Sequence, residues 1–189
     1  MYYVVQVKPR GESKYMTIAN DRLIRFEVSL FWPRRRLRIR RHGYWKNTLA
    51  AIFPGYIFVE AESLSPELYW ICKRIPGFSR FLRSNADIMP LPPRDKKLLQ
   101  HFLSFGQIVD KSLVYFDENK RIQIVAGPLK GLEGLIVKVN RRKGRAKIRL
   151  DLYEESFFID FGFEDLGHAS TEGNPTRSGT IQSGTTQKK

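Results

Sequence analysis

Residues 53–60, with the sequence FPGYIFVE, constrain the fold of this chain more than any other segment. Pro54 fixes its own φ angle and Gly55 accepts a positive φ, so the backbone turns sharply at this pair. Residues 56–59 are aromatic or β-branched and show no alternation with polar residues. A strand of this kind has both faces covered by other parts of the protein. The segment therefore predicts a tight turn followed by a central strand.

The first hundred residues alternate between strand and helix signals. Ser65 and Pro66 form a typical helix start, because serine caps the first turn and proline suits the first helical position. Cys72 falls on the inner face of that helix, so we expect a small buried core residue there. The predicted strands are residues 2–7, 27–33, 53–60 and 78–82, and the predicted helices are residues 12–26, 66–75 and 94–103. This order predicts an α+β sandwich with a small sheet.

Residues 34–41 carry six arginines in eight positions, interrupted only by Leu37 and Ile39. The alternation and the following His42-Gly43 turn predict a projecting hairpin with one cationic face. Like charges at this density repel unless salt, water or a polyanion screens them, and guanidinium groups suit phosphate contact. A solvated strand edge that resists aggregation is the alternative. The residues expected to contact nucleic acid are Arg34, Arg35, Arg36, Arg38, Arg40, Arg41 and the aromatic Trp45.

From residue 114 onward the pattern changes to short strands at turn-sized spacing. About five strands over residues 114–167 predict a small β-barrel, because so small a β unit buries its faces best by curling. Residues 105–113 show no period and are predicted to be a linker, and residues 168–189 are predicted to be disordered. A second basic cluster, which predicts either RNA contact or a solvated hairpin tip, contains Arg141, Arg142, Lys143 and Arg145.

Composition narrows the range of partners. The 189 residues carry 33 Lys and Arg against 19 Asp and Glu, a net charge of +14, which favours polyanions. The basic residues lie in predicted hairpins rather than in an amphipathic helix, so nucleic acid is favoured over a membrane surface. The amino terminus lacks the order of a signal peptide and no apolar run is long enough to span a bilayer, so we expect a cytoplasmic protein. We also expect it to be a monomer.

Sites for catalysis are not found in the sequence. One cysteine permits no internal disulfide, the three histidines are isolated, and no serine or cysteine sits in a nucleophile motif. The acidic cluster around Asp151 is explained more simply as a solvated strand end than as a pair of catalytic carboxylates. We therefore expect no enzymatic activity, no cofactor and no metal.

Three segments together resemble the NusG family of transcription elongation factors. They are residues 2–8 (YYVVQVK), residues 53–60, and residues 127–134 (GPLKGLEG). The resemblance covers most of the chain. It implies an amino-terminal NGN domain over residues 1–104, an α/β sandwich with an antiparallel sheet, and a carboxy-terminal KOW barrel over residues 114–167.

The resemblance also implies partners and contact residues. In the family, the NGN domain docks a hydrophobic face on the clamp helices of RNA polymerase, and the insertion that matches the arginine hairpin lies near upstream or non-template DNA. The candidates for the docking face, each of which could equally belong to the core, are Tyr3, Phe31, Phe53, Tyr56 and Phe81. The KOW turn is matched by Gly127, Pro128, Gly131, Leu132 and Gly134, whose glycines would supply unusual backbone angles.

These implications lead to one hypothesis and two alternatives. The hypothesis is an antitermination factor that binds the polymerase clamp, contacts DNA or nascent RNA, and suppresses pausing. The arginine hairpin and the second basic cluster favour a specialised paralog of the LoaP, UpxY or RfaH type. So does Leu132, where general members often carry an aromatic residue on a loop that contacts Rho or a ribosomal protein. The alternatives are a general NusG factor coupled to Rho or the ribosome, and a ribosome-associated RNA-binding KOW protein.

Overall fold

The first half of the chain is built on a four-stranded antiparallel sheet. The computed structural model describes residues 1–82, 88–153 and 155–167. The strands of this sheet, in spatial order, are β2 (Ser29–Phe31), β5 (Tyr56–Glu60), β1 (Tyr2–Val7) and β6 (Phe78–Phe81). β5 pairs with a neighbour on each edge and its first four residues are buried, so the predicted central strand is confirmed. Gly55 takes a φ of 82° in the turn before it, as expected.

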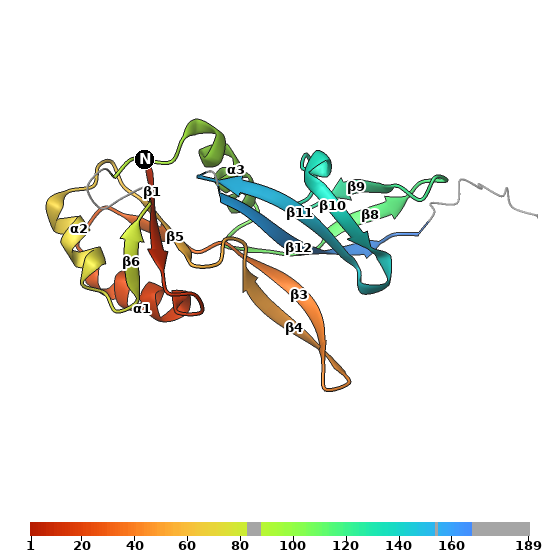
Figure 1. Ribbon diagram of the computed structural model, residues 1–189, viewed down its shortest axis with the longest axis horizontal. Coiled ribbons are helices and arrows are strands. Elements are labelled where there is room, and N and C mark those ends of the chain that lie inside the picture. Colours follow the sequence, from red (N-terminus) through yellow and green to blue (C-terminus); the bar gives the residue numbers. More distant parts are fainter. Residues whose placement is uncertain (83–87, 154, 168–189) are drawn as a thin grey trace, which may run out of the picture.

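Two helices cover one face of this sheet (Figure 1). They are α1 (Glu12–Arg22) and α2 (Pro66–Lys73). Inward residues of α1 and α2 pack against alternate residues of β1 and β5. The amide of Leu68 donates to the Ser65 hydroxyl at 3.1 Å, which confirms the predicted cap, and Cys72 is buried as expected. Burial raises the pKa of the Cys72 thiol to about 11.

α1 ends four residues earlier than the periodicity predicts. The amide of Leu23 still donates to the Ala19 carbonyl at 2.9 Å, and the chain then turns. Leu23 and Phe26 nevertheless pack in the same core as the helix. The apolar spacing therefore identified the buried residues correctly and misplaced only the helix end.

A curled five-stranded sheet forms most of the second half. Its strands, in spatial order, are β10 (Ile136–Asn140), β11 (Arg145–Leu152), β12 (Glu155–Asp165), β8 (Ser112–Phe116) and β9 (Ile122–Ala126). Among the described residues β9 and β10 remain edge strands, so the expected closed barrel is wrong and the sheet is a half-barrel. An open sheet needs a cover for its apolar face. Here Phe102 of α3 (Pro93–Leu103) stacks on Phe161 of β12, with ring centroids 5.4 Å apart.

The two halves pack against each other through the face of the first sheet that α1 and α2 leave open. Tyr2, Val4, Tyr56 and Phe58 share one core cluster with residues of β8, β11 and β12. The ring of Phe53, in the first half, makes an edge-to-face contact with the ring of Phe157, in the second half, with centroids 5.8 Å apart. One hydrophobic core therefore runs from the first sheet into the second.

Residues 105–113, expected to be a linker, contain ordered strand pairing. β7 (Ile108–Val109) pairs in parallel with the start of β3 (Arg34–Arg41), and β8 begins at Ser112. Val109 and Ser112 are both buried. The segment is too short to show a periodic pattern, and its two buried residues receive their partners from distant strands. The tail, residues 168–189, lies outside the described residues. In the described part of the chain, no helix has the length and apolar content needed to cross a membrane.

Candidate functional site

The most prominent surface feature is a two-stranded hairpin that projects from the body of the molecule (Figure 1). It consists of β3 and β4 (Tyr44–Ala51), with Arg41 paired to Tyr44 across the turn. His42 and Gly43 have φ angles of 50° and 83°, and positive φ at both central residues is the requirement of a type I′ hairpin turn. The predicted basic hairpin is therefore confirmed as a structural element, and it is anchored at its base by β7.

Arg35 points toward the protein interior rather than into solvent. It is only 8% exposed, its Nε donates to the Asp160 carbonyl at 2.6 Å, and its Nη1 donates to the carbonyl of Ala51. The guanidinium also lies over the ring of Phe161. Burial lowers the pKa of Arg35 to about 10, partly offset by Asp160. Arg35 therefore ties the hairpin to β12, although the sequence grouped it with the nucleic-acid contacts.

The other arginines of the hairpin differ in their exposure and in their partners. Arg36 forms an ion pair with Asp110 at 3.4 Å, and Arg34 lies over the ring of Trp32 at 4.6 Å. Arg38 and Arg40 are exposed, and Arg38 lies over the half-exposed ring of Trp45 at 5.0 Å. Arg41 is the last residue of β3, and its side chain lies outside the described part of the structure. The cationic face of the hairpin is thus carried by fewer residues than the sequence indicated.

The second basic cluster surrounds the turn between β10 and β11. Asn140 accepts a hydrogen bond from the amide of Lys143 at 3.0 Å, and Gly144 closes the turn in the left-handed region. Arg141 binds Asp165 at 2.9 Å and lies over the ring of Phe116, so it supports the turn itself. Arg142 and Lys143 are exposed, whereas Arg145 is half-buried.

The five aromatic residues expected on the docking face divide between the two sides of the first sheet. Tyr3 and Phe81 belong to the core beneath α1 and α2, and so form no surface in this arrangement. Phe53 and Tyr56 lie on the opposite side, with Phe31 packed at the edge of the same cluster. The second half covers that side.

Side chains of the second half, mainly from β12, make defined contacts with the aromatic side of the first sheet. The Tyr56 hydroxyl donates to the carboxylate of Glu155, and the Tyr56 ring meets that of Phe157 at 5.5 Å. Burial, followed by this bond, raises the pKa of Tyr56 above its ordinary value. Asp95 of α3 accepts a hydrogen bond from the amide of Tyr153 at 2.9 Å. The contacts of Glu155 and Phe157 were not predicted, because β12 reads as an ordinary apolar strand in the sequence.

The predicted KOW turn contains only part of the expected backbone geometry. Gly127 and Gly131 have positive φ angles, whereas Gly134 does not and instead lies in a short 3₁₀ turn, η1 (Glu133–Leu135). The carbonyl of Pro128 accepts a hydrogen bond from Nε2 of His101 on α3 at 2.8 Å. Leu132 packs at the edge of the shared core. His101, which the sequence left as an isolated surface residue, thus joins the turn to the first half.

Among the described residues, no group of three or more His, Cys, Asp and Glu side chains is placed to hold a metal ion. The surface between the basic hairpin and the turn that joins β10 to β11 is cationic and aromatic. It suits recognition of phosphates and bases.

Comparison with known proteins gives a consistent picture. Residues 1–100 match the family described as "Transcription termination factor nusG", and residues 118–149 match the KOW motif. Among curated proteins, the transcription termination/antitermination protein NusG of Borreliella burgdorferi is 24% identical over 183 residues, which covers 87% of this chain and 96% of that protein. The protein of the same name from Streptococcus pyogenes serotype M3 is 25% identical over 134 residues, 70% of this chain and 71% of that protein.

A solved structure shares the fold. It is titled "Domain interaction in Thermotoga maritima NusG" and matches with a TM-score of 0.55 at 17% identity, covering 85% of this chain and 92% of that one.

Proposed function

Because the chain belongs to the NusG family of transcription termination and antitermination factors, we propose that it binds the clamp of RNA polymerase and contacts nucleic acid during elongation. The observation that carries the proposal is the aromatic side of the first sheet, where Phe31, Phe53 and Tyr56 gather. The second half covers this side, so a movement of the second half would expose an aromatic patch of the kind that marks protein interfaces.

Clamp binding through this face requires the second half to move away from it. In the packed arrangement, Phe157 and Glu155 occupy the positions that a polymerase helix would take. We infer a two-state equilibrium in which the polymerase selects the open arrangement. The apparent affinity for polymerase is then reduced by the fraction of molecules that are closed.

Suppression of pausing follows from where such a factor binds. A protein that bridges the clamp favours its closed, processive state, which is a shift of population rather than a chemical step. The exposed arginines of the hairpin, Arg38 and Arg40, support contact with a DNA or RNA strand that leaves the enzyme. We propose that the protein acts in the cytoplasm as a non-enzymatic monomer without a cofactor.

Within the family we propose a specialised antiterminator. The basic hairpin with its stacked Arg38 and Trp45 favours this role, because it adds a nucleic-acid contact to the polymerase contact. A general factor that binds Rho or a ribosomal protein through the KOW turn is the alternative. In this structure Leu132 of that turn lies against the shared core, so such a partner would also need the open arrangement. A ribosome-associated RNA-binding protein is a further alternative, which polymerase binding distinguishes.

The test is terminator read-through by reconstituted elongation complexes. Wild-type protein is compared with the double variant Arg38→Gln/Arg40→Gln, which leaves Arg35 and its anchoring bonds intact. A matched control removes two exposed charges elsewhere, Lys14→Gln/Arg25→Gln. We expect the hairpin variant to lose most of its read-through activity while it still binds core polymerase, and the control to behave as wild type. Failure of the wild type to bind polymerase or to alter read-through would overturn the proposal and favour the RNA-binding alternative.

A further inference from the structure

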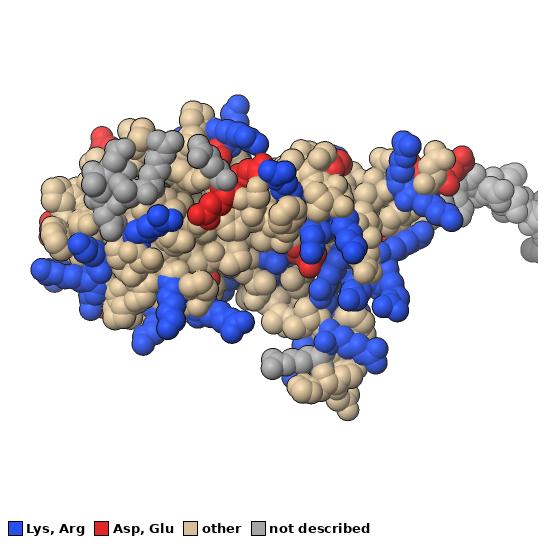
Figure 2. Space-filling model, viewed as in Figure 1, with Lys and Arg blue, Asp and Glu red and all other residues tan. Residues whose placement is uncertain are grey.

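The two basic clusters, separate in the sequence, meet along a single groove. Nη2 of Arg145, on β11, donates to the carbonyl of Arg38, on β3, at 2.7 Å. A hollow of about 190 Å³ opens beside this contact, between the basic hairpin and the turn that joins β10 to β11. Figure 2 shows Lys and Arg side chains gathered in this angle of the molecule. Its cationic and aromatic lining consists of Arg38, Trp45, Lys111, Arg142, Lys143 and Arg145.

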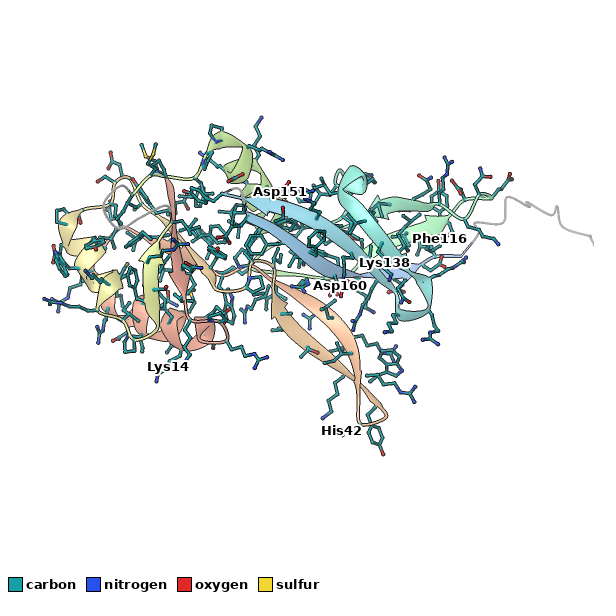
Figure 3. The ribbon with its side chains drawn as sticks, in the orientation of Figure 1. Lys14, His42, Phe116, Lys138, Asp151 and Asp160 are labelled. Atoms are coloured by element: carbon teal, nitrogen blue, oxygen red, sulfur yellow. The ribbon has the colours of Figure 1, made fainter. Side chains whose placement is uncertain are left out.

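Positive charge continues beyond this hollow. A neighbouring hollow of about 160 Å³ shares Lys143 and Arg145 and adds Lys138 and Lys147. Asp160 is the only acidic residue among the described residues that line the two hollows, and Figure 3 shows it in the same region as Lys138. Lys138 and Lys147 stand directly opposite each other on paired strands, where like charges repel. A bound polyanion would remove this repulsion.

The walls of the groove favour a single strand over a duplex. Trp45 is 45% exposed, and Arg38 lies against its ring, so the pair forms a platform on which one base can stack. The bases of a duplex are paired and stacked on each other, so they cannot reach such a platform without opening.

We propose that this groove is a binding site for single-stranded nucleic acid, with phosphates along the cations and one base on Trp45. The proposal rests on, and deepens, the nucleic-acid contact proposed above, because it makes one site from two clusters. Each half of the chain supplies part of the lining. Strand binding to the complete groove therefore stabilises the packed arrangement of the two halves. When the second half moves away to expose the clamp-binding face, the hairpin part of the site, Arg38 and Trp45, is still available for the strand.

The experiment measures binding of labelled oligonucleotides to the full-length protein without polymerase, by fluorescence anisotropy over a series of salt concentrations. The probes are oligothymidine and oligouridine of about 12 nucleotides and a mixed-sequence DNA duplex of the same length. The variants are Arg38→Gln on the hairpin, Lys143→Gln on the turn, and Trp45→Ala, with Trp45→Phe as the conservative replacement. Lys14→Gln, on α1 and far from the groove, is the control of equal charge (Figure 3).

We expect both charge variants to weaken single-strand binding and to reduce the slope of log affinity against log salt by about 0.7 per charge. Trp45→Ala should weaken binding by about 5- to 100-fold at every salt concentration, and Trp45→Phe should retain most of the affinity. A preference for oligouridine identifies RNA as the natural strand, and a preference for oligothymidine identifies DNA.

Three outcomes would overturn the proposal: equal loss with Lys14→Gln, loss from the hairpin variant but not from the turn variant, or duplex binding as tight as single-strand binding. Because polymerase is absent, these outcomes leave the clamp contact untouched. A protein that binds the strands yet never binds polymerase would instead contradict the proposed function alone.

Discussion

Gly127 and Gly134 lie in the same turn, yet their backbones impose different requirements. Gly127 has a φ of 98°, and a Cβ atom there would lie 2.7 Å from the Cα of Ser112. Gly134 has an ordinary φ, and a Cβ atom there would meet nothing within 4 Å. The close approach at Gly127 allows the Ser112 hydroxyl to accept a hydrogen bond from the backbone amide of Leu129 at 3.0 Å. One glycine is needed for the turn and the other is not.

Replacing each glycine by alanine tests this difference. Gly127→Ala combines an unfavourable φ with a backbone clash, so we expect it to lower the free energy of unfolding by about 2–4 kcal/mol. Gly134→Ala should change that free energy by less than about 0.5 kcal/mol. Urea denaturation of the two variants beside the wild type gives both values. Equal stability of the two variants would show that the turn relaxes around the added methyl group.

In strand β3, successive side chains point to opposite faces, so its arginines divide between a buried, anchoring role and an exposed role. Arg35 and Leu37 face the second half and are buried, whereas Arg36, Arg38 and Arg40 face solvent. The inward guanidinium is satisfied by carbonyls of β4 and β12 and by the ring of Phe161. The hairpin is therefore held in place by one of its arginines and presents others.

The neighbouring substitutions Arg35→Ala and Arg36→Ala separate these roles. Arg35→Ala leaves the carbonyls of Ala51 and Asp160 without a donor, so we expect a loss of about 1–3 kcal/mol in the free energy of unfolding. Arg36→Ala removes an exposed ion pair and should cost less than about 1 kcal/mol. Thermal denaturation measures the ranking, and hydrogen exchange of β3 amides shows whether the base of the hairpin loosens. A larger loss from Arg36→Ala would contradict the anchoring role of Arg35.

For the whole molecule, the packing of the second half on the first sheet decides which surfaces are available. It covers the aromatic face that the clamp contact needs, and it assembles the basic groove that the single strand needs. The clamp contact and the complete groove therefore depend on opposite arrangements of the same two halves, whereas the hairpin itself is available in both. The exchange between them is governed by a few side chains of β12.

Phe157→Ala should open the molecule without removing a residue of the polymerase-binding face. It deletes the ring contacts with Phe53 and Tyr56, which together are worth about 1–3 kcal/mol, so the open population and the apparent polymerase affinity should rise about tenfold. Phe158→Ala is the matched control, because Phe158 is the next residue and is 58% exposed. Binding to core polymerase and hydrogen exchange of β5 are measured together. If exchange of β5 rises while polymerase affinity stays constant, the face is not the polymerase contact.

Local patterns in the sequence were sufficient for the elements themselves. The central strand of residues 56–59, the capped start of α2 and the two-residue turn of the hairpin each follow from interactions between near neighbours in the chain. Such signals depend on backbone preference and periodicity, which a sequence displays directly. The family also follows from short motifs of this kind.

The tertiary structure alone decided what each polar and aromatic side chain does. Alternation puts Arg35 on the same face as Leu37, but it does not show which distant strand covers that face. Tyr3 and Tyr56 likewise lie on opposite sides of the same sheet. Their roles depend on which distant strand lies beside them, and long-range packing leaves no periodic trace in the chain. For the same reason the sequence predicted a small barrel and a linker without regular structure, where packing between the halves produced a half-barrel and a short paired strand. The sequence by itself thus determined the elements and the family. Packing decided which face is covered and where the charges meet, because those depend on the free energy of contacts between residues far apart in the chain.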